Sequence, residues 1–432
     1  MPNRTALALA ALVLPFTLPT TAAGSDLVRL GSSARAIGMG NVAGMADDAV
    51  TALSTNPAFF SGLDKGMQLS LQTFLVDAKF TSSIGERDKA DSGPGIVPDF
   101  AFVLPLENSR VTLGGGVHVE SAMVASFDFT DPPGTLGVTY GHQTHESQFT
   151  VVNSSIAAAW AWNDHLSLGA QFGFSYNRNQ LKAPYIFQSH PALQSLKVLV
   201  DLDVNDFSPT FALGFDYKGE DNTRVYASWH RKTKFDASGD TSGNLGQLGL
   251  GIQETFTYDT VVNTAMPGYL TAGVAWPAGD GLTLGVQLDW IQWDSAFAEL
   301  PILLTNGSNN DLNTFLGSTS IADTAPLAWD DQLTLHLGAQ WQRGDRQYRA
   351  GYEYSDVPVP TATMTPMTGA ILEHALSAGV SLPFNGSILD LSYRVSFSGG
   401  DRTIVASGLQ GGEYTGSSLD LVLHSVGVAF RF

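Results

Sequence analysis

The chain is dominated by short segments in which apolar and polar residues alternate. In residues 165–176 the apolar face consists of Leu166, Leu168, Ala170, Phe172, Phe174 and Tyr176. Residues 282–290 and 333–341 repeat this pattern. A period of two residues is typical of β-strands. A soluble sandwich would bury the apolar face, whereas a membrane barrel turns it toward lipid and keeps the polar face in the lumen. Alternation alone does not separate these two folds.

The spacing of the predicted strands favours the barrel. We predict fourteen strands, at residues 67–80, 98–106, 110–125, 147–162, 165–178, 206–218, 223–236, 268–277, 281–295, 331–342, 346–356, 374–384, 387–398 and 418–432. Connections after even-numbered strands are short. Those after odd-numbered strands are long, at 82–97, 126–146, 179–205, 237–267, 296–330, 357–373 and 399–417. Short turns at one end and long loops at the other are typical of an antiparallel transmembrane barrel with an even number of strands.

Composition agrees with an exported membrane barrel. Only 15% of residues are charged, 10% are aromatic, and there is no cysteine for disulfide or thiolate chemistry. Beyond the N-terminus no run of about 18 apolar residues predicts a membrane helix. The formal net charge of −19 argues against a nucleic-acid partner. Acid-rich segments fall mostly in predicted loops, where they would keep the loops solvated or bind divalent cations beside lipopolysaccharide; we favour solvation.

The N-terminus predicts a signal peptide over residues 1–23. Arg4 precedes the apolar run Ala6–Phe16, and small residues from Thr20 to Ala23 allow cleavage after Ala22 or Ala23. An uncleaved anchor helix is the alternative, which the prolines within and after the run disfavour. The predicted organisation is therefore signal peptide 1–23, an N-terminal segment 24–64 and a barrel 65–432.

The segment 31–63 is rich in glycine and alanine. It contains the acidic pair Asp47-Asp48 and ends with Asn56, Pro57 and Ala58. This order of motifs resembles the N-terminal hatch of the FadL/TodX family of outer-membrane transporters for long-chain fatty acids and hydrocarbons. Pro267-Gly268-Tyr269, the run 289–293, the run 328–332 and the prolines near 357–360 also resemble that family in their order. The resemblance implies a hatch over residues 24–64 inside the lumen, and passive uptake of hydrophobic compounds across the outer membrane.

The predicted loop 179–205 is unusually apolar and is a candidate ligand groove. We single out Tyr185, Phe187, Leu193 and Leu196 as ligand-contacting residues. Packing of the loops against each other would explain the same residues. In the family, the loops corresponding to 179–205 and 237–267 form the first capture site.

A ligand carboxylate would need a cation in the lumen. Alternation places Lys232, Lys234, Arg349 and Arg394 on the inward face, and Arg394, Arg349 and Lys232 are the candidate carboxylate ligands. A lumen salt bridge, for instance between Arg394 and Asp390 or Glu353, is the alternative for these residues.

The run Gly114, Gly115 and Gly116 interrupts the third predicted strand. Glycines inside strands mark bulges or kinks, and we expect the strand ladder to break here. In the family, a kinked third strand opens the barrel wall toward the bilayer; a plain bend for barrel curvature is the other interpretation.

The sequence offers little support for catalysis. Gly38, Gly40 and Gly44 miss the dinucleotide-binding spacing, no metal-ligand cluster stands out, and the histidines are scattered. We expect no enzymatic activity and no cofactor. The alternative functions are a non-transporting scaffold of a secretion system and a lipid hydrolase of the outer membrane. The terminal residue Phe432 closes an alternating strand and resembles the recognition signal of the barrel assembly machinery. The expected environment is outer-membrane lipid and lipopolysaccharide, and the expected state is a monomer.

Overall fold

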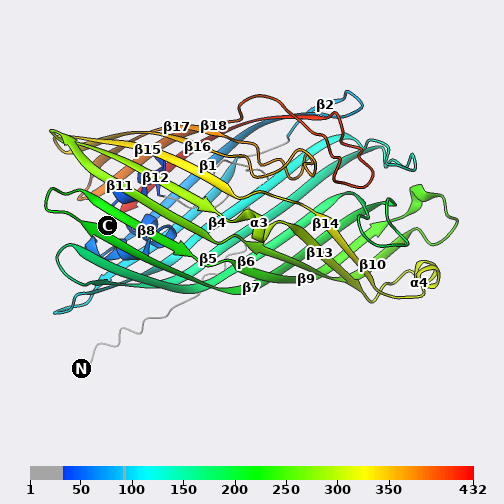
Figure 1. The fold of residues 1–432 in the computed structure, drawn as a ribbon, viewed down its shortest axis with the longest axis horizontal. Helices are drawn as coiled ribbons and strands as arrows, with labels where there is room; N and C mark the ends of the chain where they lie inside the picture. Colours follow the sequence, from blue (N-terminus) through cyan, green and yellow to red (C-terminus); the bar gives the residue numbers. More distant parts are fainter. Residues whose placement is uncertain (1–32, 91–93) are drawn as a thin grey trace.

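The computed structural model describes residues 33–90 and 94–432, whose strands form one closed antiparallel barrel (Figure 1). The predicted signal peptide and residues 24–32 lie outside the described residues. The barrel closes at β1 (Gly66–Thr81), which pairs with β20 (Ser418–Arg431) on one edge and with β3 (Gly95–Pro105) on the other. No helix among the described residues has the length and apolar character needed to cross a membrane.

The barrel wall has fourteen strand positions, as predicted. We call each position a stave, which is either one strand or two consecutive strands placed end to end. The uninterrupted staves are β1, β3, β4 (Val111–Thr130), β5 (His142–Ala161), β6 (Leu166–Ile186), β7 (Lys197–Lys218), β16 (Arg346–Ser355), β17 (His374–Phe384), β18 (Ser387–Phe397) and β20. The interrupted staves are β8 (Arg224–His230) with β9 (Thr233–Asn244), β10 (Thr255–Met266) with β11 (Tyr269–Gly279), β12 (Leu282–Ile291) with β13 (Glu299–Thr305), and β14 (Ile321–Pro326) with β15 (Gln332–Arg343). The short strands β2 (Arg87–Lys89) and β19 (Arg402–Thr403) pair with the ends of β1 and β20.

The apolar face of a strand changes side along its length. In β7, Phe207, Leu213, Phe215 and Tyr217 are exposed on the outer face, as expected for contact with lipid. Farther toward the long-loop end of the same strand, Val198, Val200, Leu202 and Val204 are buried on the inner face. The barrel therefore continues beyond the lipid-facing band as a wall that is apolar inside.

Because the strands extend this far, the long loops predicted from the sequence are longer than the loops of the structure. Residues 179–186 continue β6 and residues 197–205 begin β7, so the predicted loop 179–205 is mostly strand. In the same way, the predicted loop 237–267 contains most of β9 and all of β10, and the predicted loop 296–330 contains β13 and β14. The short helical segments beyond the lipid-facing band are η3 (Gly246–Leu248) and α4 (Asn310–Leu316), while α3 (Trp293–Ala296) interrupts the wall between β12 and β13.

The N-terminal residues fill the short-turn end of the lumen (Figure 1). They form four short helices, α1 (Ala34–Ile37), η1 (Ala43–Met45), α2 (Ala49–Ser54) and η2 (Pro57–Gly62). Helix α1 contacts β17, β18 and β20, α2 contacts β1, β3 and β4, η2 contacts β4 to β7, and η1 contacts β8, β11 and β12. A segment that touches staves all around a closed barrel lies inside it, so this segment is the hatch.

Candidate functional site

A cavity of about 300 Å³ lies inside the long-loop half of the barrel. Its walls come from distant strands, including Ala78 of β1, Phe149 of β5, Leu202 of β7 and Val262 of β10. Most lining side chains are apolar, and of the described residues that line it, Glu413 is the one acidic or basic residue. A concave, apolar chamber with few polar groups is typical of a site for small hydrophobic ligands.

Aromatic side chains from the interrupted staves form part of the cavity wall. Phe297 and Trp329 line the cavity, and Trp293 packs against both, with ring centroids 5.0 Å from each. Trp293 belongs to α3, in the break between β12 and β13, whereas Trp329 lies in the break between β14 and β15. The segments that interrupt these strands therefore bring three large rings together in the lumen.

Two long connections cover the cavity. Met367 and Ala370 belong to the connection 356–373, and Leu409 and Tyr414 belong to the connection 398–417. The connections are joined by backbone hydrogen bonds, including one of 2.8 Å from the Gly408 amide to the Ala362 carbonyl. We call these two connections the roof.

A buried cation joins the roof to the barrel. The Nζ atom of Lys197, at the start of β7, lies 2.5 Å from Oδ1 of Asp131 and 4.0 Å from Oε1 of Glu413. It also donates to the carbonyl of Pro132 at 2.6 Å. Burial raises the pKa of Asp131 and of Glu413, and the charge of Lys197 opposes that rise. The ammonium group of Lys197 thus ties the roof to β7 and to the connection 131–141.

The four predicted loop residues pack in one apolar cluster, and Tyr185 lines the cavity as well. Tyr185 lines the cavity, and its hydroxyl donates to Asp323 at 2.7 Å. Phe187, Leu193 and Leu196 pack beside Tyr185 in an apolar cluster with residues of β7, α4 and the segment that joins β9 to β10. For these three, packing between loops is the contact that the structure shows, and ligand contact stays a prediction.

None of the predicted basic residues lines the cavity. Arg394 donates to Oε1 of Glu353 at 2.7 Å, which is the salt bridge weighed as the alternative. Arg349 contacts Asp390 at 3.3 Å, and Lys232 donates to the carbonyl of Ser295. Lys234 was expected to face the lumen, but this is wrong. It is exposed between the buried Thr233 and Phe235, and so points outward.

The motif Asn56-Pro57-Ala58 fixes the hatch to the wall. Asn56 caps η2 by accepting from the Ala58 amide at 3.0 Å, and its Nδ2 donates to the carbonyls of Phe215 and Ala227 at 3.0 and 3.2 Å. Pro57 suits the first helical position because its φ is already helical and it has no amide hydrogen to satisfy. Glycines of β6 and β7, Gly169 and Gly214, leave the space that Pro57, Ala58 and Asn56 occupy.

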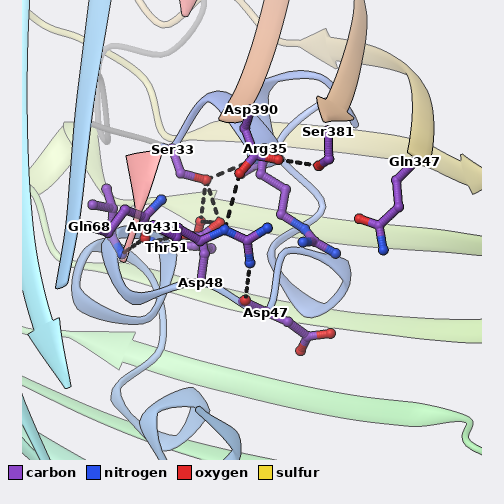
Figure 2. A network of polar contacts seen from close by, with 12 residues as sticks. Ser33, Arg35, Asp47, Asp48, Thr51, Gln68, Gln347, Ser381, Asp390 and Arg431 are labelled. Atoms are coloured by element: carbon purple, nitrogen blue, oxygen red, sulfur yellow. Dashed lines mark hydrogen bonds and ion pairs between the residues drawn. The ribbon is translucent and has the colours of Figure 1, made fainter. Parts of the chain in front are cut away.

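A polar network anchors the other end of the hatch (Figure 2). Asp48 caps α2 by accepting from the Thr51 amide at 2.8 Å, and it also accepts from Ser33 at 2.6 Å. Burial raises the pKa of Asp48, and these hydrogen bonds oppose the rise. Arg431 of β20 donates to the Asp47 carbonyl at 3.4 Å and to Asp390 at 3.1 Å. The hatch is therefore bonded to the wall on opposite sides of the lumen.

β4, the third stave, separates from β3 just beyond the predicted glycines. Gly114, Gly115 and Gly116 pair with both β3 and β5, so the predicted break of the ladder at these residues is wrong. A Cβ atom on Gly114 would collide with Phe60 of the hatch, which explains the small residue there. The β3 ladder ends at Val117, and the β5 ladder shifts register between Val119 and Ser121. Among the described residues, β4 from 118 to 127 has no ladder partner on its β3 side.

Sequence reasoning missed the residues that build most of the cavity. The roof residues, Phe297 and Trp329 were not predicted as ligand-contacting. Trp329 belongs to the run 328–332, whose resemblance to the family was the available signal. The roof carries no alternation or spacing from which its position could be derived.

The sequence model of the outer-membrane protein transport proteins (OMPP1/FadL/TodX) matches residues 13–394. The fold is similar to the solved toluene transporter TodX of P. putida, with a TM-score of 0.73, 18% identity, and coverage of 93% of this chain and 98% of that one. The fold is also similar to the Ralstonia pickettii toluene transporter TbuX, with a TM-score of 0.70, 17% identity, and coverage of 93% of this chain and 98% of that one. For a Pseudomonas aeruginosa FadL homologue the TM-score is 0.70 and the identity 18%, with coverage of 95% of this chain and 98% of that one.

None of the curated proteins compared with the chain matches it. The family model nevertheless covers most of the sequence, and the barrel, the lumenal hatch and the lipid-facing apolar band agree with it. The chain belongs to the OMPP1/FadL/TodX family of outer-membrane transport proteins.

Proposed function

We propose that the protein takes up hydrophobic compounds, hydrocarbons or fatty acids, by diffusion through the outer membrane, and that the roofed cavity is where it binds them. The observation that carries this proposal is the apolar chamber of about 300 Å³ inside a barrel otherwise closed by the hatch. Burial of apolar ligand surface in such a chamber supplies the affinity without an energy source. Solved proteins of similar fold are described as toluene transporters and as a monoaromatic hydrocarbon channel.

The proposed route has three stages. The long-loop end captures the compound and the cavity binds it. The edge of β4 beyond Val117, which has no ladder partner among the described residues, releases it sideways into the bilayer. The hatch supports this route, because its contacts with staves all around the lumen oppose a straight passage to the short-turn end. Sideways release keeps an apolar compound out of water at every stage.

Filling the cavity tests the proposal. Ala325 of β14 lines the cavity, whereas Ala322 of the same strand is exposed on the opposite face. Ala325→Trp should lower toluene uptake by cells that express the full chain, because the indole occupies the space of the ligand. Ala322→Trp should leave uptake unchanged, since it adds the same group outside the barrel.

The measurement is uptake of labelled toluene above an empty-vector control, with barrel assembly checked by heat-modifiable mobility on a gel. Equal uptake by folded Ala325→Trp and wild type would remove the cavity from the route. Absence of toluene and fatty acid uptake by wild type would contradict the transport function itself.

A further inference from the structure

The wall of the cavity carries a group of polar side chains near the end of β6. Gln188, Gln410 and Glu413 line the cavity there, and the backbone amide of Gln410 donates to Oε1 of Gln188 at 2.8 Å. Ile186, the last residue of β6, also lines the cavity. A Cβ atom on Gly411 would collide with both Cδ1 of Ile186 and Oε2 of Glu413, so these two atoms border the same small space. We call Gln188, Gln410 and Glu413 the polar corner.

The cavity extends from the polar corner toward the hatch. Ile186 is opposite Lys197 in the β6–β7 register, at the long-loop end of both strands. Phe149 is opposite Asn179, which lies farther along β6 toward the hatch. The rings of Phe149 and Phe297 line this part of the cavity and pack edge to face, with centroids 5.5 Å apart. A compound with one polar end and one apolar end would therefore lie with its polar end at the roof.

Glu413 lacks the hydrogen bonds that other polar side chains of the wall have. Ser147 donates to the Met367 carbonyl at 2.9 Å, and Nε2 of Gln188 donates to a backbone carbonyl at 2.8 Å. A contact with its own amide apart, the Glu413 carboxyl group has no hydrogen bond among the described residues. The Lys197 ammonium is 4.0 Å away, which is too far for one. Since most buried polar groups are hydrogen-bonded, this carboxyl group is available to a ligand.

Gln410 supplies a hydrogen-bond donor to complement this acceptor. Oε1 of Gln410 accepts from Ser195 at 3.2 Å, whereas its Nε2 has no partner among the described residues. Gly411 and Gly412, which separate Gln410 from Glu413, have φ angles of 90° and 59°, so the chain turns sharply between the two side chains. A hydroxyl group both donates and accepts hydrogen bonds, and it therefore suits the carboxyl oxygens and the amide nitrogen together.

The fit of a hydroxyl group does not depend on the charge of Glu413. Burial raises the pKa of Glu413, and the charge of Lys197 opposes that rise. An ionised carboxylate accepts a hydrogen bond, and a protonated carboxyl group accepts one and donates another. An uncharged ligand also avoids the large cost of moving an ion from water into an apolar cavity.

We propose that the polar corner binds the hydroxyl group of uncharged, amphipathic compounds such as alkylphenols, whose apolar part lies in the cavity toward the hatch. This inference rests on the proposed function and specifies its substrate class. In a purely apolar cavity, a phenol would bind more weakly than the matching hydrocarbon, because its hydroxyl group loses the hydrogen bonds it makes with water. The polar corner replaces those hydrogen bonds.

The test compares the binding of ethylbenzene, 4-ethylphenol and 4-ethylanisole to the purified protein in detergent, by equilibrium dialysis against a detergent-only blank. All three are uncharged at neutral pH, and of the three the phenol alone has a hydrogen to donate. Glu413→Met removes the acceptor oxygens and leaves Lys197 its contacts with Asp131 and Pro132. It should weaken 4-ethylphenol binding relative to ethylbenzene about tenfold, the effect of one lost buried hydrogen bond. The ratio of 4-ethylanisole to ethylbenzene should not change.

Two further variants serve as controls, with barrel assembly checked by heat-modifiable mobility. Glu413→Gln keeps an acceptor oxygen and should keep the 4-ethylphenol ratio near that of wild type. Asp401→Met also replaces a carboxyl group of the connection 398–417, but Asp401 is exposed and does not line the cavity. It should leave all three affinities unchanged.

The role of the polar corner is overturned if folded Glu413→Met protein keeps the wild-type ratio of 4-ethylphenol to ethylbenzene. A roof that is merely loosened gives this result, because it weakens the binding of all three compounds alike. An equal loss of 4-ethylanisole and 4-ethylphenol binding, or an equal change of ratio in Glu413→Gln and Glu413→Met, also overturns it. Wild type that binds none of the compounds above the detergent blank would refute the proposed binding function of the cavity itself, a result distinct from an unchanged ratio.

Discussion

The two halves of the lumen are built on opposite principles. In the half toward the short turns, the hatch meets the wall through directed hydrogen bonds, such as those from Asn56 to Phe215 and from Arg431 to Asp47, and through wall glycines that leave no spare volume. In the half toward the long loops, apolar side chains surround an open cavity. Directed, close contacts specify one geometry, whereas apolar contact is non-directional. The half of the lumen that holds the hatch therefore needs one fixed arrangement of its side chains. The half that holds the cavity, which we call the ligand half, can accommodate several arrangements.

The largest difference should appear when a wall glycine under the hatch is replaced. A Cβ atom on Gly169 of β6 would overlap the backbone of Pro57 and Ala58, which cannot move aside as a flexible side chain could. Gly169→Val should cost more than the roughly 1–3 kcal/mol usual for overpacking, and it should displace the hatch. The measurement is entry of a large hydrophilic solute into proteoliposomes.

The control is Leu168→Val, which changes the adjacent residue on the lipid-facing side of the same strand. It should leave the solute excluded. If Gly169→Val protein assembles and still excludes the solute, the close fit of the hatch is not what seals the lumen.

The next effect concerns the roof, which is held to the barrel by the buried ammonium group of Lys197. Lys197→Met leaves Asp131 and Glu413 buried without their cation. Breaking a buried ion pair in this way costs about 3–5 kcal/mol. We expect the connection 398–417 to exchange its amide hydrogens faster, while the strands of the hatch half keep their protection. Lys182→Met, at an exposed position of the adjoining strand β6, should leave exchange unchanged. Unchanged exchange in Lys197→Met would show that other contacts hold the roof.

Much of the barrel could be predicted because lipid imposes a simple pattern. Wherever a strand crosses the lipid-facing band its outer face is apolar, as in Phe172 and Phe174 of β6, and alternation locates it. Beyond that band the outer face meets water. In β10, Thr255, Thr257 and Asp259 are exposed while Phe256 and Tyr258 are buried. Alternation persists there with its faces reversed and polar residues in excess, so these segments were predicted as loops.

The site could be predicted only in part, because its residues are joined by the barrel and not by local sequence. The hatch motif was recognisable, since Asn56, Pro57 and Ala58 are consecutive. The cavity combines Ala78, Leu202 and Tyr414, which no spacing relates. Arg394 was placed in the lumen by alternation, but the partner that occupies it, Glu353, lies on a strand two staves away. The alternation of apolar and polar residues predicts which face of the strand a side chain lies on. Its contacts with residues of distant strands follow only from the closed barrel.

The smallest expected effect tests how tolerant the ligand half is. Leu202 lines the cavity and is 8% exposed, whereas Leu53 of the hatch is fully buried among packed side chains. A Leu→Met change keeps the volume nearly constant and usually costs less than about 1.5 kcal/mol. Leu202→Met should be close to neutral in denaturant unfolding and in toluene uptake, because the longer side chain can extend into the cavity. Leu53→Met should lower the free energy of unfolding more than Leu202→Met does, within that range. No cavity borders Leu53, and the hatch backbone is fixed at both ends. Equal unfolding costs for the two variants would mean that the two halves of the lumen are packed alike, and the contrast between a fixed hatch and an adaptable cavity would fail.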